Sequence, residues 1–459
     1  MLDVRRIRRH FDFPAAGRVV TNNAASTQPP RELIGLYREL ARSYENVHRG
    51  QSSASQRTTD AFEASFDTIA AWINAPSRRS IVTYRNTTEA INAVMYSLLT
   101  EFRDGDNVVT TLMEHNSDFV PWYALSREIL PRLGRRVECR LARFDHASGR
   151  LDLDHLADLI DDRTKLVCVT GASNFLGTKP PLDLIRRLSR DSGYAQPSGE
   201  NGSLLLVDGA QLVPSSPVDV GALDVDYLAF SFHKMLAPFG VGVLYAKEHL
   251  LEASLPFLYG GDMIATGRVS PDRVDYNDLP WKYSAGTPNI LGTIVSAQAL
   301  RLTLDLVQGG RPSWFGTERP IPWETVASCM GTVSRHTAAM TELARKRLRD
   351  VVGLRVYGPQ PGVDRSPLLA FNVDGFDPFW LADGLNEFGV ESRAGCHCAT
   401  LAHRDLGLIP PASCRLSFAL YTNADDVERA TEAVRCLTSR GRRRTRARAD
   451  DAGARGQRR

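Results

Sequence analysis

The chain of 459 residues is long enough for two or three domains, and its composition, 43% hydrophobic and 24% charged, is that of a soluble globular protein. Its seven thinly spread cysteines, an odd number with no secretory signal before them, speak against a disulfide framework. No apolar stretch approaches the roughly 18 residues of a membrane span, so we expect a cytoplasmic protein with no membrane partner.

Charge is concentrated at the C-terminus. Residues 439–459 hold nine Arg and two Asp, a net charge of +7, so the rest of the chain carries −4 of the total of +3. This segment lacks apolar periodicity, which predicts a disordered tail. A solvated tail is favoured over a nucleic-acid arm, and we expect no nucleic-acid partner.

From about residue 60 to 300, short apolar runs alternate with helical patterns such as that of residues 182–188. This alternation predicts an α/β fold in which helices cover both faces of a mainly parallel central sheet. The runs are SIVTY (80–84), NVVTT (107–111), TKLVCVT (164–170), SLLLVD (203–208), VDYLAF (225–230) and GVGVLY (240–245).

After Gly292 the pattern changes to two long helices, near 294–307 and 326–349, which flank a Pro- and Gly-rich insertion at 309–324. Short strands and one helix follow. We therefore expect a large α/β domain over 34–305, a smaller α+β domain over 306–438 that packs with the N-terminal segment 1–33, and the tail 439–459.

Two residues follow neighbouring strands and suggest a cofactor. Asp208 ends a strand, where a buried carboxylate needs a cation or donors, and Lys234 follows the next strand in apolar surroundings that lower the pKa of an amine. Each alone is more often structural. Together they fit pyridoxal phosphate (PLP), which requires a lysine for a Schiff base and an acid for its ring nitrogen.

A phosphate cup and a stacking group are also present. Thr87 and Thr88 begin a helix after a strand, where free N–H groups and hydroxyls suit a phosphate, although a plain N-cap explains the same pattern. His115 follows another strand, where an imidazole can stack on a planar ring and move protons, or serve only as a structural residue.

The stretch SRAGCHCATLAH (392–403) places Cys396 and Cys398 one residue apart. A zinc pair prefers at least two intervening residues, and a disulfide over one residue is strained. We therefore expect no metal, and favour a mobile loop that carries a reactive sulfur.

The motifs in order are NTTEAIN, MEHNSDFVPW, ASNFLGT, VDGAQ, SFHK, YSAGTPN, RAGCHCA and CRLSFALYTN. Over roughly residues 20–437 they resemble the class V aminotransferase-like, fold-type I PLP enzymes, closest to the SUF-type (group II) cysteine desulfurases. The resemblance implies a homodimer that converts L-cysteine to L-alanine, with a persulfide on Cys398 that passes to a sulfur-acceptor protein.

The resemblance also implies a role for each matching residue. Lys234, Cys398 and His115 would be catalytic. Cofactor contacts would come from Thr87, Thr88, His115, Asn174, Asp208, Gln211, Ser231, His233 and Lys234, with Thr287 reaching the phosphate of the partner subunit. Substrate contacts would come from Arg415, Asn174, Arg393 and His48.

The sequence departs from this family in several places. HNSD (115–118) replaces the usual HHAN, SFHK replaces SGHK, and Cys396 replaces a histidine. Phe232 and Leu236 would make the surroundings of the cofactor more apolar. An alternative function is therefore a C–S lyase or aminotransferase acting on a cysteine conjugate or another amino acid, and a noncatalytic scaffold is a third possibility.

Overall fold

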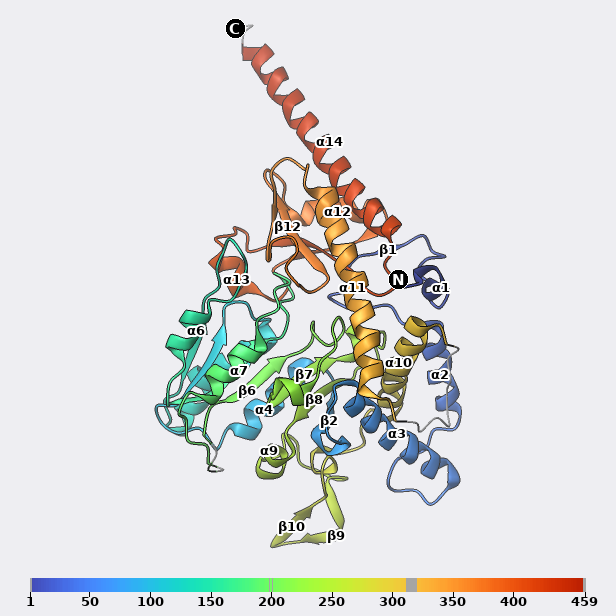
Figure 1. Ribbon diagram of the computed structural model, residues 1–459, viewed down its shortest axis with the longest axis vertical. Coiled ribbons are helices and arrows are strands. Elements are labelled where there is room, and N and C mark those ends of the chain that lie inside the picture. Colours follow the sequence, from blue (N-terminus) through green and yellow to red (C-terminus); the bar gives the residue numbers. More distant parts are fainter. Residues whose placement is uncertain (1, 198, 200, 311–319, 457–459) are drawn as a thin grey trace.

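The computed structural model describes residues 2–197, 199, 201–310 and 320–456, so residues 311–319 of the expected insertion lie outside the described residues. A seven-stranded sheet forms the centre of the molecule (Figure 1), and in the part of the chain that the structure describes β8 alone runs opposite to the other six strands. The expected mainly parallel sheet is confirmed. Its order is β2 (Ile81–Tyr84), β8 (Gly242–Ala246), β7 (Tyr227–Ser231), β6 (Leu204–Asp208), β5 (Thr164–Thr170), β3 (Asn107–Thr111) and β4 (Glu138–Ala142).

Both faces of this sheet are buried. Leu205 and Val207 of β6 belong to one hydrophobic cluster, and Leu204 and Leu206 to another, as alternation along a strand requires. The edge strand β4 was not anticipated, because its sequence ECRLA lacks an apolar run. Helices of this domain are α2 (Arg31–Arg42), α3 (Ser53–Trp72), α4 (Thr87–Leu98), α5 (Val120–Ala124), α6 (Leu153–Leu159), α7 (Leu182–Arg190), α8 (Val220–Leu223), α9 (Glu248–Ala253) and α10 (Ile290–Gln308).

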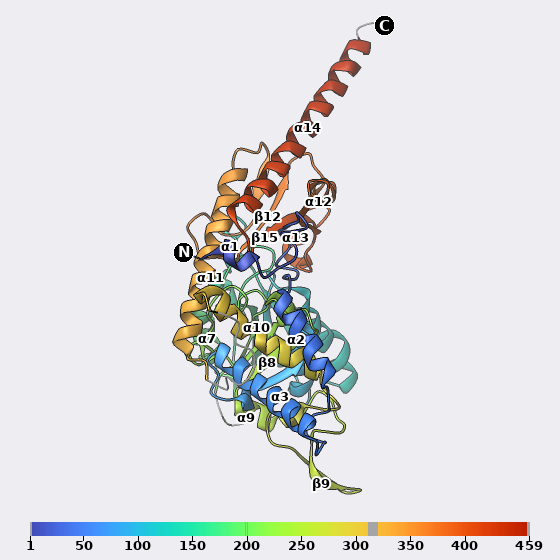
Figure 2. The same ribbon diagram turned by 90° about the vertical axis from the view of Figure 1, so that its right-hand side faces the viewer.

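Helix α10 is long and apolar enough to cross a membrane, with a mean hydropathy of 1.4. However, 72% of that stretch is buried inside the protein, where α10 packs against α2 and α3 (Figure 2). The apolar character of α10 is therefore that of a core helix.

A second, four-stranded antiparallel sheet lies beside the first. Its order is β11 (Leu354–Val356), β12 (Leu368–Val373), β15 (Ser413–Ser417) and β14 (Arg393–Gly395). The N-terminal β1 (Val19–Val20) pairs with β13 (Val390–Glu391), which supports the expected packing of segment 1–33 with this part of the chain. The domain boundaries themselves stay a prediction. The remaining elements are α1 (Val4–Arg8), α11 (Trp323–Leu348), α12 (Pro378–Glu387), α13 (Thr400–Asp405), and a hairpin of β9 (Ile264–Ser270) and β10 (Arg273–Tyr276).

The last helix, α14 (Ala424–Gly456), continues through most of the segment for which the sequence predicts disorder. Its outer half projects from the body, at the opposite end of the molecule from the β9–β10 hairpin (Figures 1 and 2). Ala and Arg are strong helix formers, and a helix already nucleated by packed residues extends without a second nucleation cost. Apolar periodicity is therefore not required for this extension.

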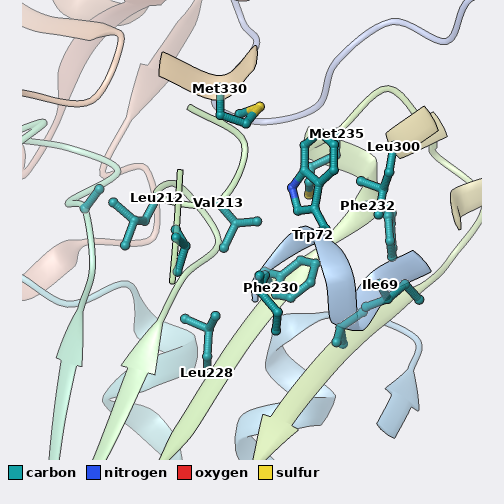
Figure 3. Packing of buried hydrophobic residues seen from close by; sticks show 14 of the residues in the cluster. Ile69, Trp72, Leu212, Val213, Leu228, Phe230, Phe232, Met235, Leu300 and Met330 are labelled. Atoms are coloured by element: carbon teal, nitrogen blue, oxygen red, sulfur yellow. The ribbon is translucent and has the colours of Figure 1, made fainter. Parts of the chain in front are cut away.

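The residues on either side of Lys234 anchor the end of β7 in the core. Phe232 is fully buried and lies 5.9 Å from Phe230 between ring centroids, and Met235 belongs to the same cluster. Figure 3 shows Trp72, Phe232 and Met235 gathered above the strands. The segment that carries Lys234 is thus held by apolar packing on both sides.

We predict that Phe232→Ala lowers the free energy of unfolding by about 3–5 kcal/mol, because the truncation leaves a cavity in this cluster. Urea denaturation of the cofactor-free protein measures the change. Phe388→Ala is the matched control, since that ring is 38% exposed. Equal losses in the two variants would contradict the anchoring role.

Candidate active site

A cavity of ≈ 790 Å³, its open mouth included, lies at the carboxyl ends of β5, β6 and β7. Ligands of α/β sheets collect at this edge. The cavity is closed from the other side by residues of the second sheet and its loops. Its lining includes Ala24, Ala25, Thr87, Thr88, His115, Asn174, Asp208, Gln211, Ser231, His233, Lys234, Arg393, His397 and Arg415.

Most of the predicted site residues are therefore brought together. The described lining includes neither Phe232 nor Leu236, so the expectation that they make the surroundings of the cofactor more apolar stays a prediction. Both side chains belong to the main hydrophobic cluster, because apolar groups gain from burial among other apolar groups.

Lys234 and Asp208 influence one another across this cavity. Burial lowers the pKa of Lys234 to about 8, with the Asp208 carboxylate opposing the shift and Arg415 and Arg393 adding to it. Burial also raises the pKa of Asp208, which is opposed by Lys234 and by a hydrogen bond from the Ala210 N–H at 2.9 Å. A substantial fraction of Lys234 is thus neutral and nucleophilic near neutral pH.

The start of α4 forms the anion-binding end of the cavity. The Thr87 N–H donates to Ser231 Oγ at 2.7 Å, and the two hydroxyls lie 2.5 Å apart. Gly242 of β8 allows this loop to approach, since a Cβ there would lie 2.4 Å from the Asn86 carbonyl carbon. The Thr87 and Glu89 N–H groups are engaged by Ser231 Oγ and Asn86 Oδ1. The Thr88 N–H and the nearby hydroxyls are therefore the groups of this turn that suit a phosphate.

His115 is held as a neutral imidazole. Its Nδ1 accepts a hydrogen bond from the Ser117 N–H at 3.1 Å, so the ring proton lies on Nε2. Burial lowers the pKa of His115 to about 3, and the cations Lys234, Arg393 and Arg415 add to this shift. The ring can therefore stack and donate from Nε2 without carrying a charge.

Arg415 on β15 is buried and does not use all of its hydrogen-bond donors within the described residues. Its Nη1 donates to the Asn174 carbonyl at 2.7 Å, while Nε and Nη2 have no partner among the described residues. Burial lowers the pKa of Arg415 to about 9, and Arg393, its direct cross-strand neighbour on β14, adds to the shift. Two adjacent arginines in a buried wall favour an anion, and the free Nε and Nη2 match a carboxylate.

Cys398 lies in the turn between β14 and α13. His397 and Cys398 both adopt left-handed conformations, with φ of 52° and 58°. The Cys398 carbonyl accepts from the Asn116 N–H at 2.6 Å, and the His397 carbonyl accepts from Asn174 Nδ2 at 2.6 Å. The Arg393 Nη2 lies 3.7 Å from the Cys398 Sγ, which places a cation beside the sulfur. The loop is thus clamped at two carbonyls, where the sequence predicts mobility.

Like Cys398, two further predicted residues, His48 and Thr287, are absent from the lining of this cavity. His48 lies against Glu63, with 3.2 Å between its Nε2 and the carboxylate, and against the ring of Trp281. Thr287 is exposed in the segment before α10. Their roles as substrate and partner-subunit contacts stay predictions for a site that a second copy of the chain would complete.

Comparison with known proteins gives the family. The class-V aminotransferase model matches residues 19–308 and 312–430. The chain belongs to the class-V aminotransferase family. A probable cysteine desulfurase of Halobacterium salinarum is 38% identical, over 94% of this chain and 96% of the relative.

Solved structures of this family share the fold. The Escherichia coli cysteine desulfurase CsdA matches with a TM-score of 0.78 and 30% identity, over 95% of this chain and 98% of that chain. A Thermococcus onnurineus cysteine desulfurase matches with a TM-score of 0.81 and 28% identity, over 94% and 97% of the two chains. The fold-type I architecture expected from the sequence is confirmed. A C-DES mutant with glycine linked to its PLP cofactor shares the fold alone, with a TM-score of 0.73 and 18% identity over 93% and 98% of the chains.

Sequence reasoning missed a buried pair of acids behind the cavity. Glu114 Oε1 accepts from the Thr111 hydroxyl at 2.6 Å, and Asp118 Oδ1 accepts from Trp122 Nε1 at 3.3 Å. Burial raises the pKa of Glu114 to about 8 and also raises that of Asp118, each reinforced by neighbouring carboxylates. Asp118 is the last residue of HNSD, where the family usually has asparagine, and that departure was the available signal.

We predict that Asp118→Asn stabilises the protein increasingly as pH rises from about 4, the ordinary pKa of an aspartate, towards the raised pKa of Asp118 in the folded protein. A carboxyl whose folded pKa is raised keeps a proton that the unfolded chain has lost, so its contribution to stability falls with pH through this window. For one retained proton the slope is about 1.4 kcal/mol per pH unit.

Urea denaturation at several pH values measures the difference between Asp118→Asn and the unmodified protein. The exposed Asp383 provides the control, and Asp383→Asn should leave the pH profile unchanged. A difference that stays flat across the window would show that the acid pair is not protonated in the folded state.

Proposed function

We propose that the chain is a PLP-dependent cysteine desulfurase that converts L-cysteine to L-alanine and leaves a persulfide on Cys398. Relatives with this name are 38% identical over most of the chain. The observation that carries the proposal is Arg415, which lines the same cavity as Lys234 and Asp208 and whose Nε and Nη2 have no partner among the described residues. The Cys398 sulfur lies beside Arg393.

The residues of the cavity suit PLP. When bound, PLP withdraws electrons from the bonds of an attached amino acid. The Lys234 amine would hold the cofactor covalently, the Asp208 carboxylate would pair with its ring nitrogen, and the neutral ring of His115 would stack on it. Phosphate contacts would come from the first turn of α4 and from Thr87, Thr88, Ser231 and His233, and further contacts from Asn174 and Gln211.

The chain's own groups supply the remaining steps. Arg415 binds the substrate carboxylate, and Lys234, with its lowered pKa, moves the Cα proton. The Cys398 thiolate then attacks the substrate sulfur, so that an S–S bond forms and the C–S bond breaks. The electron pair of the broken bond leaves with the carbon chain, which is protonated and released as alanine.

The proposal includes partners and a location. The active form is a homodimer, in which Thr287 and His48 serve the neighbouring site, and the persulfide passes to a sulfur-acceptor protein in the cytoplasm. The exposure of Thr287 supports the first part. The helical, Arg-rich end of α14 has no part in this chemistry, and nucleic acid is not a proposed ligand.

We predict that borohydride fixes PLP to the peptide that contains Lys234, and that Lys234→Ala abolishes this link. Absorption spectra and peptide mass spectrometry report the attachment. The exposed Lys346 provides the control, because Lys346→Ala should retain the cofactor fully. Cofactor retained on another lysine in wild-type protein would rule out the assigned role.

We predict that Cys398→Ala reduces alanine and sulfide release by about a hundredfold or more, because the nucleophile is lost. L-Cysteine should still change the cofactor spectrum of this variant. The matched control is Cys396→Ala, which should retain most of the activity. Alkylation and mass spectrometry of wild-type protein after L-cysteine should show one added sulfur on the Cys398 peptide.

The same experiment addresses the alternative function. A C–S lyase or aminotransferase breaks bonds without an enzyme thiol, so Cys398→Ala would then turn over like wild type and produce pyruvate or another oxo acid. That outcome would replace the desulfurase proposal.

A further inference from the structure

A chain of buried hydrogen bonds supports the Cys398 loop from behind. The Ser413 hydroxyl lies between two imidazoles, 3.1 Å from His397 Nε2 and 3.0 Å from His403 Nε2. His403 Nδ1 lies 2.9 Å from the Ala399 carbonyl, and the ring of Phe175 stacks on His403 at 3.7 Å. None of these contacts was assigned a function above.

These contacts determine where each proton lies. A carbonyl oxygen only accepts, so His403 Nδ1 carries a proton and its Nε2 is bare. Burial lowers the pKa of His403 to about 4, so the ring stays neutral. The bare Nε2 accepts a hydrogen bond from the Ser413 hydroxyl, and the Ser413 oxygen therefore accepts one from His397 Nε2. His397 must then carry its single proton on Nε2 and leave Nδ1 bare, because burial also lowers the pKa of His397 well below its usual value.

The bare Nδ1 of His397 is a buried, unpaired acceptor on a residue that lines the active-site cavity. His397 is 1% exposed and belongs to the cavity lining, and its Nδ1 has no hydrogen-bond partner among the described residues. The residue cannot easily turn away, since its carbonyl is held by Asn174 and its ring by Ser413. A buried acceptor without a donor destabilises the protein, and a ligand that supplies the donor recovers this free energy.

The chemistry of an amino-acid substrate leaves few donors for this nitrogen. The carboxylate only accepts, and it is matched by the free Nε and Nη2 of Arg415. The amino group of the substrate is needed at Lys234, where the cofactor would be held. For L-cysteine the remaining donor is the thiol, whose sulfur must lie near Cys398, the residue next to His397.

We propose that His397 is a substrate-contacting residue whose Nδ1 accepts a hydrogen bond from the thiol of bound L-cysteine, with Ser413 and His403 as positioning residues that fix its tautomer. This proposal rests on the proposed desulfurase function. The contact orients the substrate sulfur toward Cys398 and disfavours amino acids without a side-chain donor. The S–H proton stays on the sulfur during transfer, so a neutral acceptor suffices and no base is needed.

Two variants separate the cavity contact from the structural contact. Asn resembles His as far as Nδ1 and tolerates a left-handed conformation, so His397→Asn retains an acceptor toward the cavity but loses the Ser413 bond. Gln resembles His at Nε2, so His397→Gln retains the Ser413 bond but loses the acceptor. Both are made in the Cys398→Ala background, where turnover does not obscure binding.

Binding of L-cysteine and of L-alanine is measured by titration of the cofactor absorption. We expect His397→Gln to weaken L-cysteine about tenfold, which corresponds to about 1.4 kcal/mol, and to leave L-alanine unchanged. His397→Asn should weaken L-cysteine less. Equal losses for both ligands, or a larger loss in His397→Asn than in His397→Gln, would overturn the proposal.

The tautomer is tested without any ligand. In ¹⁵N-histidine-labelled holoprotein, the side-chain spectrum should show His397 with a protonated Nε2 and a bare Nδ1, unchanged from about pH 5.5 to 8.5. Loss of the signal in His397→Asn assigns it, and Ser413→Ala should release the tautomer. A proton on Nδ1, or titration near the ordinary histidine pKa, would refute the assignment.

These readouts are independent of the desulfurase assay. If wild-type protein releases no alanine from L-cysteine while His397→Gln still weakens L-cysteine selectively, the proposed function fails and the thiol contact stands. If alanine is released and the selectivity is absent, the thiol contact alone fails.

Discussion

The removal of Lys234 from water at the carboxyl edge of the large sheet is the constraint on which the site depends. Burial disfavours the ammonium form, and the Asp208 carboxylate offsets only part of that cost. The segment that holds Lys234 is fixed by Phe232 and Met235 in the core, so the amine stays at the wall of the cavity. A reactive lysine thus follows directly from the packing of β7.

The second sheet contributes through the alternation of β15. Ser413, Arg415 and Ser417 share one face of this strand, which turns toward the cavity and the N-terminal segment, while Cys414 and Leu416 on the other face belong to the core of the second sheet. One strand therefore places both the carboxylate-binding Arg415 and the hydroxyl that orients His397. Asn174 accepts a hydrogen bond from Arg415 and donates one to the His397 carbonyl. The same residue therefore positions both the guanidinium of Arg415 and the loop that carries Cys398.

The site also combines positively charged side chains with neutral histidine rings. His115, His397 and His403 all have pKa values shifted downward by burial. Because these imidazoles are neutral, the positive charge that faces an anion in the site comes from Arg393 and Arg415. The pKa of the buried Glu114 is raised to about 8, so this acid keeps a proton near neutral pH, and burial raises the pKa of Asp118 as well. Both shifts reduce the negative charge that would oppose these cations.

The sequence by itself determined the α/β class, the strands from residue 80 to 246, and the Asp208 and Lys234 pair, because apolar runs and the residues at their ends are local signals. The sequence did not predict three features: the edge strand β4, the helical end of α14 and the inward packing of Phe232. Each of them depends on which neighbouring residues cover it. Only the tertiary structure decided that Arg415 keeps two free donors, that the Cys398 loop is clamped, and that Ser413 joins His397 to His403. Those contacts join residues far apart in the chain, and hydrogen-bond partners across such distances leave no periodic trace in a single sequence.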